Sequence, residues 1–517
     1  MKSRKGIFLR SSSAALAISL LLTVFPFASG TGGEKAEGLV TGSPSAAFFD
    51  TCSLAEKYGV SFEKQGFASM EDSFKAVYGG IFFKGVKKVI LCLDMSEASS
   101  EYEPDIPADP SQTENVGSLE VYQNEYGVRF SELEETFRLD RAKSALESVK
   151  QIADICSEKN VSLTLVMMPI HTSRWDSINK DDIKSYKKEL CKISDYWDFS
   201  VSTLSADMRY FYTRDCMRPF TGDMMLEKMT GGKTYLPAGF GSLITRTIVS
   251  EAVKKQVDAE YVFNDSNYTR NVPVLMYHHI TDNVRSSSEV TPDTFRSHME
   301  ALKTAGYTTI SAKQMIDFVE SGTPLPEKPV LITLDDGYLS NYEIAYPVLK
   351  ELSMKAVIFT IGASIGKSTY KDTTYPITPH FTYEQAIEMK NSGVIEIQSH
   401  TYDMHQSAPY EGTPYARTTA LPFEGESEEE YIAALETDFM TYRQKYGFDF
   451  YALAYPKGQY NDITEAVFHS LGIKLTVTTY TDRVNTLVRG IPQSLYSLCR
   501  YNVPESSADN MLAMIAQ

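Results

Sequence analysis

The stretch VLITLDDG, residues 330–337, decides how the second half of this chain folds. Five apolar or β-branched residues follow Pro329 and lead directly into Asp335, Asp336 and Gly337. A short apolar run bounded by proline and glycine is typical of a buried strand, whose last residues emerge together at one end. Two adjacent carboxylates there repel each other, unless a divalent cation binds one and leaves the other free as a base. The alternative is a plain surface turn, and this stretch alone favours that alternative.

The sequence around this stretch predicts strands that alternate with helices. Ser427 and Glu430 form a capping box at the start of one helix, and Tyr431 and Leu435 lie on one of its faces. Alternation of this kind predicts an α/β fold, here an irregular β/α barrel of seven to eight units over residues 272–517. The predicted strands are residues 274–277, 307–310, 330–334, 356–361, 394–398, 451–455 and 474–478.

Polar residues stand just past the carboxyl ends of several predicted strands. A barrel places its chemistry at that edge, because the loops that follow the strands meet there. Any one of these residues alone would be an ordinary loop residue, but several at one rim predict a functional site. In chain order they are His278, Asp335, Asp336, His400, His405 and Lys457, which follows Pro456.

Three of these residues fit the ligand set of a catalytic zinc ion. Such a site takes three protein ligands and leaves a position open for water, whose pKa falls towards about 7. Asp336, His400 and His405 would supply one carboxylate and two imidazoles. The two histidines of SHTYDMH are five positions apart, which does not place them on one helix face, so we expect a loop or a turn that opens a helix.

The combined motifs make residues 272–517 resemble the polysaccharide deacetylases, the family with the NodB homology domain. TLDDG stands for the usual TFDDG, SHTYDMH for the usual histidine metal motif, and AYPKGQY for the aromatic-Pro-aromatic-Gly loop. PVLMYHHI near the start and LCRYNVP near the end are similar to the branch that deacetylates poly-N-acetylglucosamine. In that branch the domain is circularly permuted, so the catalytic acid comes from the leading Tyr-His strand.

This resemblance implies a role for each residue. Asp335 would be the general base and His278 the general acid. The three residues of the zinc set would bind a divalent cation, which we expect to be zinc. The backbone N–H of Lys457 would stabilise the oxyanion. A base and an acid on opposite sides of the scissile C–N bond are what amide hydrolysis needs.

Several positions depart from the family pattern. The commoner spacing of the metal histidines is four, which falls here on Met404; the permuted branch accepts five, and Asp403 is the reserve ligand. Ala454 stands where many members have an arginine that orients the base. Arg500, in LCRYNVP, could take that task or form a surface salt bridge instead.

Other positions bear on the substrate. Lys457 replaces an aromatic residue, which changes the sugar-facing wall and could favour an anionic substrate. His279 competes with His278 for the role of acid, and His278 is preferred because it matches the family's Tyr-His. Some aromatic side chains could stack on sugars, with core packing as the default: Tyr338, Tyr402 and Tyr455.

Residues 31–264 predict a separate α/β domain with a parallel sheet. An apolar strand at residues 89–94, an amphipathic helix from Leu139 to Cys156 and a strand at residues 161–169 follow one another. A polar stretch, residues 258–270, separates this half from the barrel.

Two pieces of this half resemble the SGNH-type esterase-like domains of bacterial envelope proteins. GSPSAAFFD from Gly42 stands where that family has its nucleophile turn, and YFYTRDCMRPFTGDMML from Tyr210 stands where it has the acid and the histidine. The positions that match the nucleophile, the acid and the histidine are Pro44, Thr213 and Cys216.

The substitutions predict a degenerate site. Ser43 or Ser45 could still be proposed as the nucleophile, but without a histidine a serine has no base to take its proton. His171 is the only histidine in this half. We therefore expect a module that has lost catalysis and binds glycan or a partner.

The start of the chain predicts export. MKSRKGIFLR is basic and contains no acid, an apolar run continues to Phe27, and Ala28, Ser29 and Gly30 offer a cleavage point. Residues 1–30 are therefore a predicted signal peptide, with an uncleaved membrane anchor as the lesser reading because the run is short for a bilayer. We expect a secreted or cell-envelope protein; its oligomeric state is not predicted.

Charge and cysteine content exclude some classes of partner and site. A net charge of −17 disfavours nucleic acid and anionic membranes as partners. Six dispersed cysteines without a CxxC pair exclude a zinc ribbon and are too sparse for a disulfide scaffold.

These observations predict an exported, metal-dependent deacetylase that removes N-acetyl groups from an N-acetylglucosamine polysaccharide of the envelope or biofilm matrix. A glycan-binding or assembly protein that has lost catalysis is the first alternative, and it need not contain metal. A deacetylase-fold hydrolase that cuts another C–N bond is the second. An O-acetyl esterase in the first half is a weaker idea.

Overall fold

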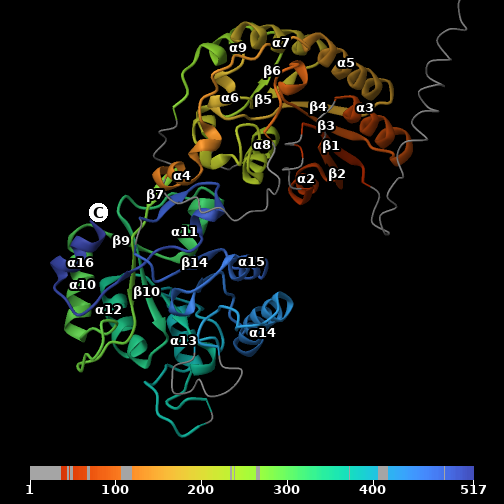
Figure 1. Ribbon diagram of the computed structural model, residues 1–517. Helices are drawn as coiled ribbons and strands as arrows, with labels where there is room; N and C mark the ends of the chain where they lie inside the picture. The colour runs from red at the N-terminus through yellow and green to blue at the C-terminus, as the bar shows by residue number, and fades with distance from the viewer. Residues whose placement is uncertain are drawn as a thin grey trace, which may run out of the picture.

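The computed structural model describes residues 36–43, 46, 51–66, 70–105, 119–232, 236–237, 239–262, 268–371, 373–405, 417–481 and 484–516. These residues form two lobes, each built around its own sheet (Figure 1). The predicted signal peptide, residues 1–30, lies outside the described residues. In the described part of the chain, no helix has the length and apolar character needed to cross a membrane.

The first lobe contains a six-stranded sheet. Its strands are β1 (Gly38–Gly42), β2 (Phe62–Gly66), β3 (Lys88–Leu93), β4 (Ser162–Met167), β5 (Tyr196–Asp198) and β6 (Ser242–Ile244). They lie in the order β2-β1-β3-β4-β5-β6, and all pairs are parallel except β5 with β6. The predicted parallel sheet is therefore present, with one antiparallel strand at its edge.

Helices cover both faces of this sheet, because alternate strand residues are apolar on each side. On one face Leu91 and Leu165 pack with α3 (Met70–Gly79), α5 (Ala142–Glu158), α7 (Lys180–Ile193) and α9 (Val249–Asp258). On the other face Ile90 and Val166 pack with α2 (Thr51–Tyr58), α4 (Leu119–Tyr126) and α8 (Pro219–Thr230). The short helix α6 (Thr172–Asp176) follows β4.

The second lobe is built around a parallel sheet that contains the predicted strands. Six neighbours in this sheet are β8 (Val274–Tyr277), β10 (Pro329–Asp336), β11 (Ala356–Thr360), β12 (Ile395–Ser399), β13 (Ala452–Ala454) and β14 (Leu475–Val477). The predicted strand at residues 307–310 is β9 (Thr308–Ile310), which pairs with the start of β10 and lies off this path.

The end of the chain closes this sheet into an irregular barrel. Leu498 forms a parallel bridge with Val477 of β14, and Thr478 N donates to Leu498 O at 2.9 Å. A few residues later, β16 (Tyr501–Asn502) pairs in parallel with β8. One short segment therefore joins the two edge strands, and it carries Arg500 between them.

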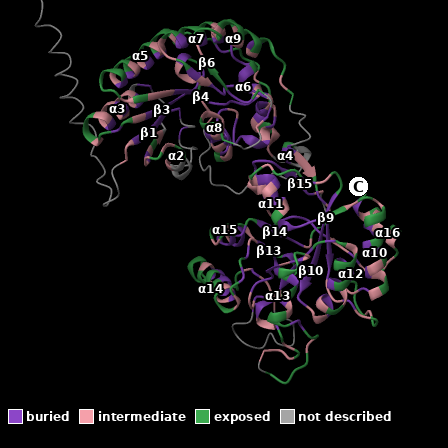
Figure 2. Cartoon of the chain, turned by 180° about the vertical axis from the view of Figure 1, so that it is seen from behind, coloured by how far each residue is buried: buried purple, intermediate pink, exposed green. Residues whose placement is uncertain are grey.

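Alternation along β10 separates an inner from an outer layer. Ile332 and Leu334 pack with the surrounding helices, whereas Leu331 packs inside with Val357 and Ala452. Figure 2 shows the strands largely buried and the helices exposed on their outer faces. The helices of this lobe are α10 (Pro292–Thr304), α11 (Ala312–Glu320), α12 (Tyr346–Leu352), α13 (Tyr383–Asn391), α14 (Glu428–Tyr446), α15 (Asp462–Ser470) and α16 (Ala508–Ile515). The capping box of Ser427 predicts the start of α14 correctly.

The two lobes meet at a buried seam. β7 (Thr269–Asn271) pairs antiparallel with β15 (Thr486–Val488). Tyr210 Oη of the first lobe donates to Arg489 O at 2.8 Å, and Arg489 N donates to Tyr268 O at 2.8 Å. Gly490 has a φ of 80°, and a Cβ there would lie 2.0 Å from the Phe220 ring. The end of the polar stretch, residues 258–270, is therefore packed into the interface between the lobes.

Candidate metal centre

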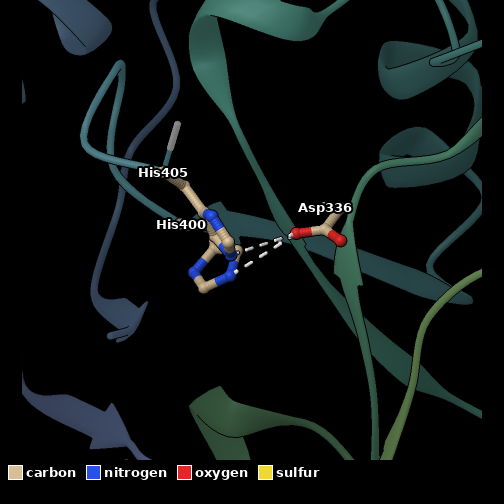
Figure 3. Close-up of side chains that lie close together, drawn as sticks. All are labelled: Asp336, His400 and His405. Carbon is tan, nitrogen blue, oxygen red and sulfur yellow. Dashed lines mark ion pairs between the residues drawn. The ribbon is translucent and has the colours of Figure 1, made fainter. Parts of the chain in front are cut away.

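Asp336, His400 and His405 converge at the carboxyl ends of the barrel strands. Asp336 is the last residue of β10, His400 directly follows β12, and His405 lies in the loop beyond it. Asp336 Oδ1 lies 3.6 Å from Nε2 of His400 and 3.8 Å from Nε2 of His405, as the dashed lines in Figure 3 show. One ligand atom from each residue lies within 4.8 Å of the others, so the three can share one cation.

The donor set fits a divalent cation. Asp336 Oδ1 is buried without a hydrogen-bond partner, which is costly unless a ligand compensates. His400 Nδ1 lies 2.7 Å from the carbonyl oxygen of Ala454. Because a carbonyl only accepts, Nδ1 carries the proton and the lone pair of Nε2 is directed at Asp336. One carboxylate oxygen and two imidazole nitrogens are ligands that zinc takes.

The backbone brings two adjacent acids to the same site. Neighbouring side chains of a strand point to opposite faces, but Asp336 leaves that pattern with a φ of 73°. Gly337 follows with a φ of 84°, and a Cβ there would lie 2.9 Å from Thr360 Cγ2, so the turn requires glycine. As a result, His400 Nε2 lies 3.8 Å from Asp335 Oδ2 as well as close to Asp336.

An acid from helix α14 holds the loop between the two histidines. Asp438 accepts the backbone N–H groups of Tyr402 at 2.7 Å and Asp403 at 2.8 Å. Burial raises the pKa of Asp438 to about 7, and the two N–H groups partly offset that rise. Sequence reasoning missed this residue. A signal was available, since Asp438 stands three positions after Leu435 on the buried face of α14.

A buried guanidinium holds Asp335. Arg500 Nη1 and Nη2 donate to Oδ1 and Oδ2 of Asp335, both at 2.7 Å. Burial alone would raise the pKa of Asp335, but Arg500 and then His400 outweigh it and hold that pKa well below its usual range. The Arg500 side chain is 0% exposed, so the alternative of a surface salt bridge is wrong. The closing segment of the barrel buries it.

The two neighbouring histidines after β8 have different partners. His278 Nε2 lies 4.0 Å from Asp335 Oδ2. His279 Nδ1 lies 2.8 Å from Ser340 Oγ, and burial lowers the pKa of His279. His278 therefore lies next to Asp335, the predicted base, whereas His279 contacts Ser340.

The charges in the cluster favour metal binding. Burial opposes ionisation of Asp336, but His405, His278 and His400 outweigh it and lower its pKa. Burial, and then His400, lower the pKa of His405 to about 4. The acid is therefore ionised and the His405 ring neutral near pH 7, which is the state in which both act as ligands.

Asp403, the reserve ligand, lies apart from this cluster. Its carboxylate contacts Lys371 Nζ at 2.5 Å. Met404, at the commoner position of the second histidine, is buried. His405 therefore completes the cluster, and the segment between the histidines is the predicted loop.

All six sequence-predicted residues of the barrel line one cavity of about 360 Å³: His278, Asp335, Asp336, His400, His405 and Lys457. Lys457 adopts a φ of 56° in the turn after β13, and the role of its backbone N–H stays a prediction. Tyr455 is buried and stacks on Tyr460, which favours core packing for that ring. A larger groove of about 730 Å³ between α5 and α7 contains none of the six, so volume alone does not mark the chemistry.

In the part of the first lobe that the structure describes, the predicted positions form no group of potential metal ligands. Pro44 and Ser45 lie outside the described residues. Cys216 is buried in the apolar cluster of the second face. His171 Nδ1 lies 2.9 Å from Ser173 Oγ, and burial is the main cause that lowers the pKa of His171 to about 4. Thr213 Oγ1 donates to the backbone oxygen of Asp105.

Comparisons with known proteins agree with this geometry. Residues 322–476 match the family model described as polysaccharide deacetylase. YxkH of Bacillus subtilis (strain 168), provisionally named as a polysaccharide deacetylase, is 32% identical over 251 residues, which cover 48% of this chain and 78% of that protein.

Two further relatives match over shorter segments, and both are named poly-beta-1,6-N-acetyl-D-glucosamine N-deacetylase. The protein of Escherichia coli (strain K12) is 28% identical over 138 residues, 25% of this chain and 20% of that protein. The protein of Staphylococcus epidermidis is 30% identical over 116 residues, 22% of this chain and 38% of that protein. The chain thus spans well under half of either relative.

Among solved structures, a de-N-acetylase from Aggregatibacter actinomycetemcomitans aligns with a TM-score of 0.40 at 24% identity. The alignment covers 47% of this chain and 100% of that one.

Proposed function

This chain belongs to the polysaccharide deacetylase family, and on that premise we propose that it is a metal-dependent hydrolase of N-acetyl groups on an N-acetylglucosamine polymer outside the cytoplasm. The two relatives named as poly-beta-1,6-N-acetyl-D-glucosamine N-deacetylases support that choice of polymer. The predicted signal peptide supports the location.

One observation carries the metal part of this proposal. Asp336 Oδ1 is buried without a hydrogen-bond donor and faces two imidazole nitrogens at 3.6 Å and 3.8 Å. Burial of these groups without a bound ligand would cost free energy. Asp336, His400 and His405 would hold a divalent cation, zinc in this proposal, and when bound it would supply Lewis acidity at the acetamide carbonyl.

The remaining residues divide the proton transfers. Asp335, kept ionised by Arg500, would take a proton from the attacking water. His278, 4.0 Å from Asp335, would donate a proton to the nitrogen of the departing amine. The backbone N–H of Lys457 would donate to the developing oxyanion. The products are acetate and a free amine on the sugar.

We assign the first lobe, residues 31–264, to a module without catalysis of its own. The residue that matches the family's histidine is Cys216, buried among apolar side chains. The lobe's sole histidine, His171, caps helix α6 through Nδ1. These observations support a degenerate SGNH-like domain that holds glycan or a partner.

The direct test is acetate release from a β-1,6-linked N-acetylglucosamine oligomer by the zinc-loaded full chain. Asp335→Asn should abolish release while the zinc content stays near one per chain, because the base is lost and the ligand set remains. Asp449→Asn is the matched control, since its side chain is 85% exposed and lies outside the cavity.

Three outcomes would overturn parts of the proposal. Activity retained in Asp335→Asn would remove that residue from the role of base. A protein that binds glycan, carries no metal and is indifferent to a chelator would be the non-catalytic alternative. Turnover of small amides without turnover of the oligomer would indicate another C–N substrate.

A further inference from the structure

A second cavity, of about 300 Å³, adjoins the first at two of the metal-ligand residues. It shares Asp336, Tyr338 and His405 with the 360 Å³ cavity that contains His278 and Lys457. Asp336 and His405 therefore line both cavities, whereas His400 lines only the first. The proposed base and acid line only the first, so the second, here named the hairpin cavity, has no part in the proton transfers.

The hairpin cavity has an ordered wall. Residues 367–371 and 373–380, between β11 and α13, form a hairpin that lines it. Backbone hydrogen bonds of 2.7 to 3.0 Å hold the hairpin to itself and to the residue after Tyr338: Ile377 to Ser368, Tyr370 to Tyr375 and Leu339 to Pro379.

The tip of the hairpin reaches the loop that carries His405. Lys371, with a φ of 47°, places Nζ 2.5 Å from the Asp403 carboxylate. Both side chains line the hairpin cavity and stay partly exposed, at 38% and 30%. An ammonium donates and a carboxylate accepts hydrogen bonds, so the pair presents both kinds of polar group to the cavity.

Two further features suit a sugar ring. His380 lines the cavity, is 8% exposed, and its Nδ1 has no hydrogen-bond partner, which is costly in a site that stays empty. Ile361, Pro376 and Ile377 add apolar lining. A pyranose offers hydroxyl groups at its edge and C–H groups on its faces, which matches a cavity with both kinds of wall.

We propose that the hairpin cavity binds the sugar next to the one that is deacetylated, and that Lys371 and Asp403 thereby set a preference for chains over single sugars. This inference rests on the proposed function and names the part of the substrate that the second cavity takes. Binding energy from a sugar that does not react would be used to orient the one that does.

The test compares two substrates, N-acetylglucosamine and its β-1,6-linked disaccharide, by kcat/KM. In the wild type the disaccharide should be preferred, and in Lys371→Met this preference should fall about tenfold, the size expected for one hydrogen bond to a charged group. Asp403→Asn should lower it too. The matched control is Lys390→Met on α13, outside both cavities, which should keep the wild-type ratio.

If kcat/KM falls by the same factor for both substrates, the effect of Lys371→Met is structural and the inference is overturned. The inference is also overturned if kcat/KM changes for neither substrate. Calorimetry of disaccharide binding to the full chain with Asp335→Asn separates this inference from the proposed function. Disaccharide binding that Lys371→Met weakens about tenfold supports the cavity even if the wild type releases no acetate. Acetate release with disaccharide binding indifferent to Lys371 leaves the proposed function standing and removes the inference.

Discussion

In the first lobe, the buried acids Asp198 and Asp215 are paired with cations of the same chain, whereas at the barrel mouth Asp336 faces imidazoles. Asp215 accepts two hydrogen bonds of 2.9 Å from Arg174, and Asp198 pairs with Lys187 at 2.8 Å. Asp336 Oδ1 has no such donor. A buried carboxylate with an internal counter-charge already has its partner, whereas one without it is available to a ligand.

The largest expected effect is that of Asp336→Asn. The amide cannot replace a carboxylate ligand, so zinc content should fall and kcat/KM should drop by at least about 10³, as loss of several kcal/mol of transition-state stabilisation implies. The melting temperature of the metal-free protein should fall only slightly, because burial and Asp335 oppose the charge of Asp336 and only the neighbouring histidines offset them. A large loss of metal-free stability would make Asp336 a structural acid like those of the first lobe.

Asp215→Ala should have the opposite effect: it should lower stability and leave the zinc content unchanged. Arg174 would remain buried without its partner, so the unfolding free energy of the first lobe should fall by about 3–5 kcal/mol. Both tryptophans, Trp175 and Trp197, lie in that lobe, so their fluorescence in a denaturant titration reports its unfolding. Asp154→Ala, at an exposed pair, is the control. A fall in zinc content in Asp215→Ala would contradict this comparison, because it would show that metal binding in the barrel depends on an ion pair of the first lobe.

Arg500→Met should move the acid limb of the pH profile. Arg500 depresses the pKa of Asp335, and a base must be ionised to act, so removal of the guanidinium raises that pKa and shifts the acid limb of kcat/KM to higher pH. Arg500→Lys keeps the charge but loses the paired geometry, so its shift should be smaller. An unmoved limb in Arg500→Met would assign the limb to another group.

The smallest effect is expected for Ser43→Ala. Without a histidine to activate it, this serine should contribute nothing to hydrolysis, so acetate release should change by less than about twofold. Acetyl ester hydrolysis that depended on Ser43 would instead make the first lobe an esterase.

The sequence predicted the barrel well because its strands are short apolar runs that end in polar residues. β8, β10 and β12 lie within one or two residues of the predicted ranges. The off-path position of β9 was not predicted, since an apolar run does not say which neighbour it pairs with.

Site residues that belong to short local motifs could be predicted from the sequence. Contacts that depend on how the barrel closes or how a loop runs could not. Asp336, His400 and His405 stand in short motifs, and their meeting follows from the order of parallel strands. Arg500 lies 165 residues from Asp335, and the closing segment of the barrel brings them together. The Lys371–Asp403 contact depends on the path of a hairpin, which no local pattern specifies.

The central claim is that Asp336, His400 and His405 bind one divalent cation. A crystal structure of the zinc-soaked full chain, with anomalous data at the zinc edge, tests it directly. We expect one strong peak about 2.0–2.2 Å from Asp336 Oδ1 and from Nε2 of both histidines. The absence of a peak between these three atoms, or a peak bound by Asp403 in place of His405, would contradict it.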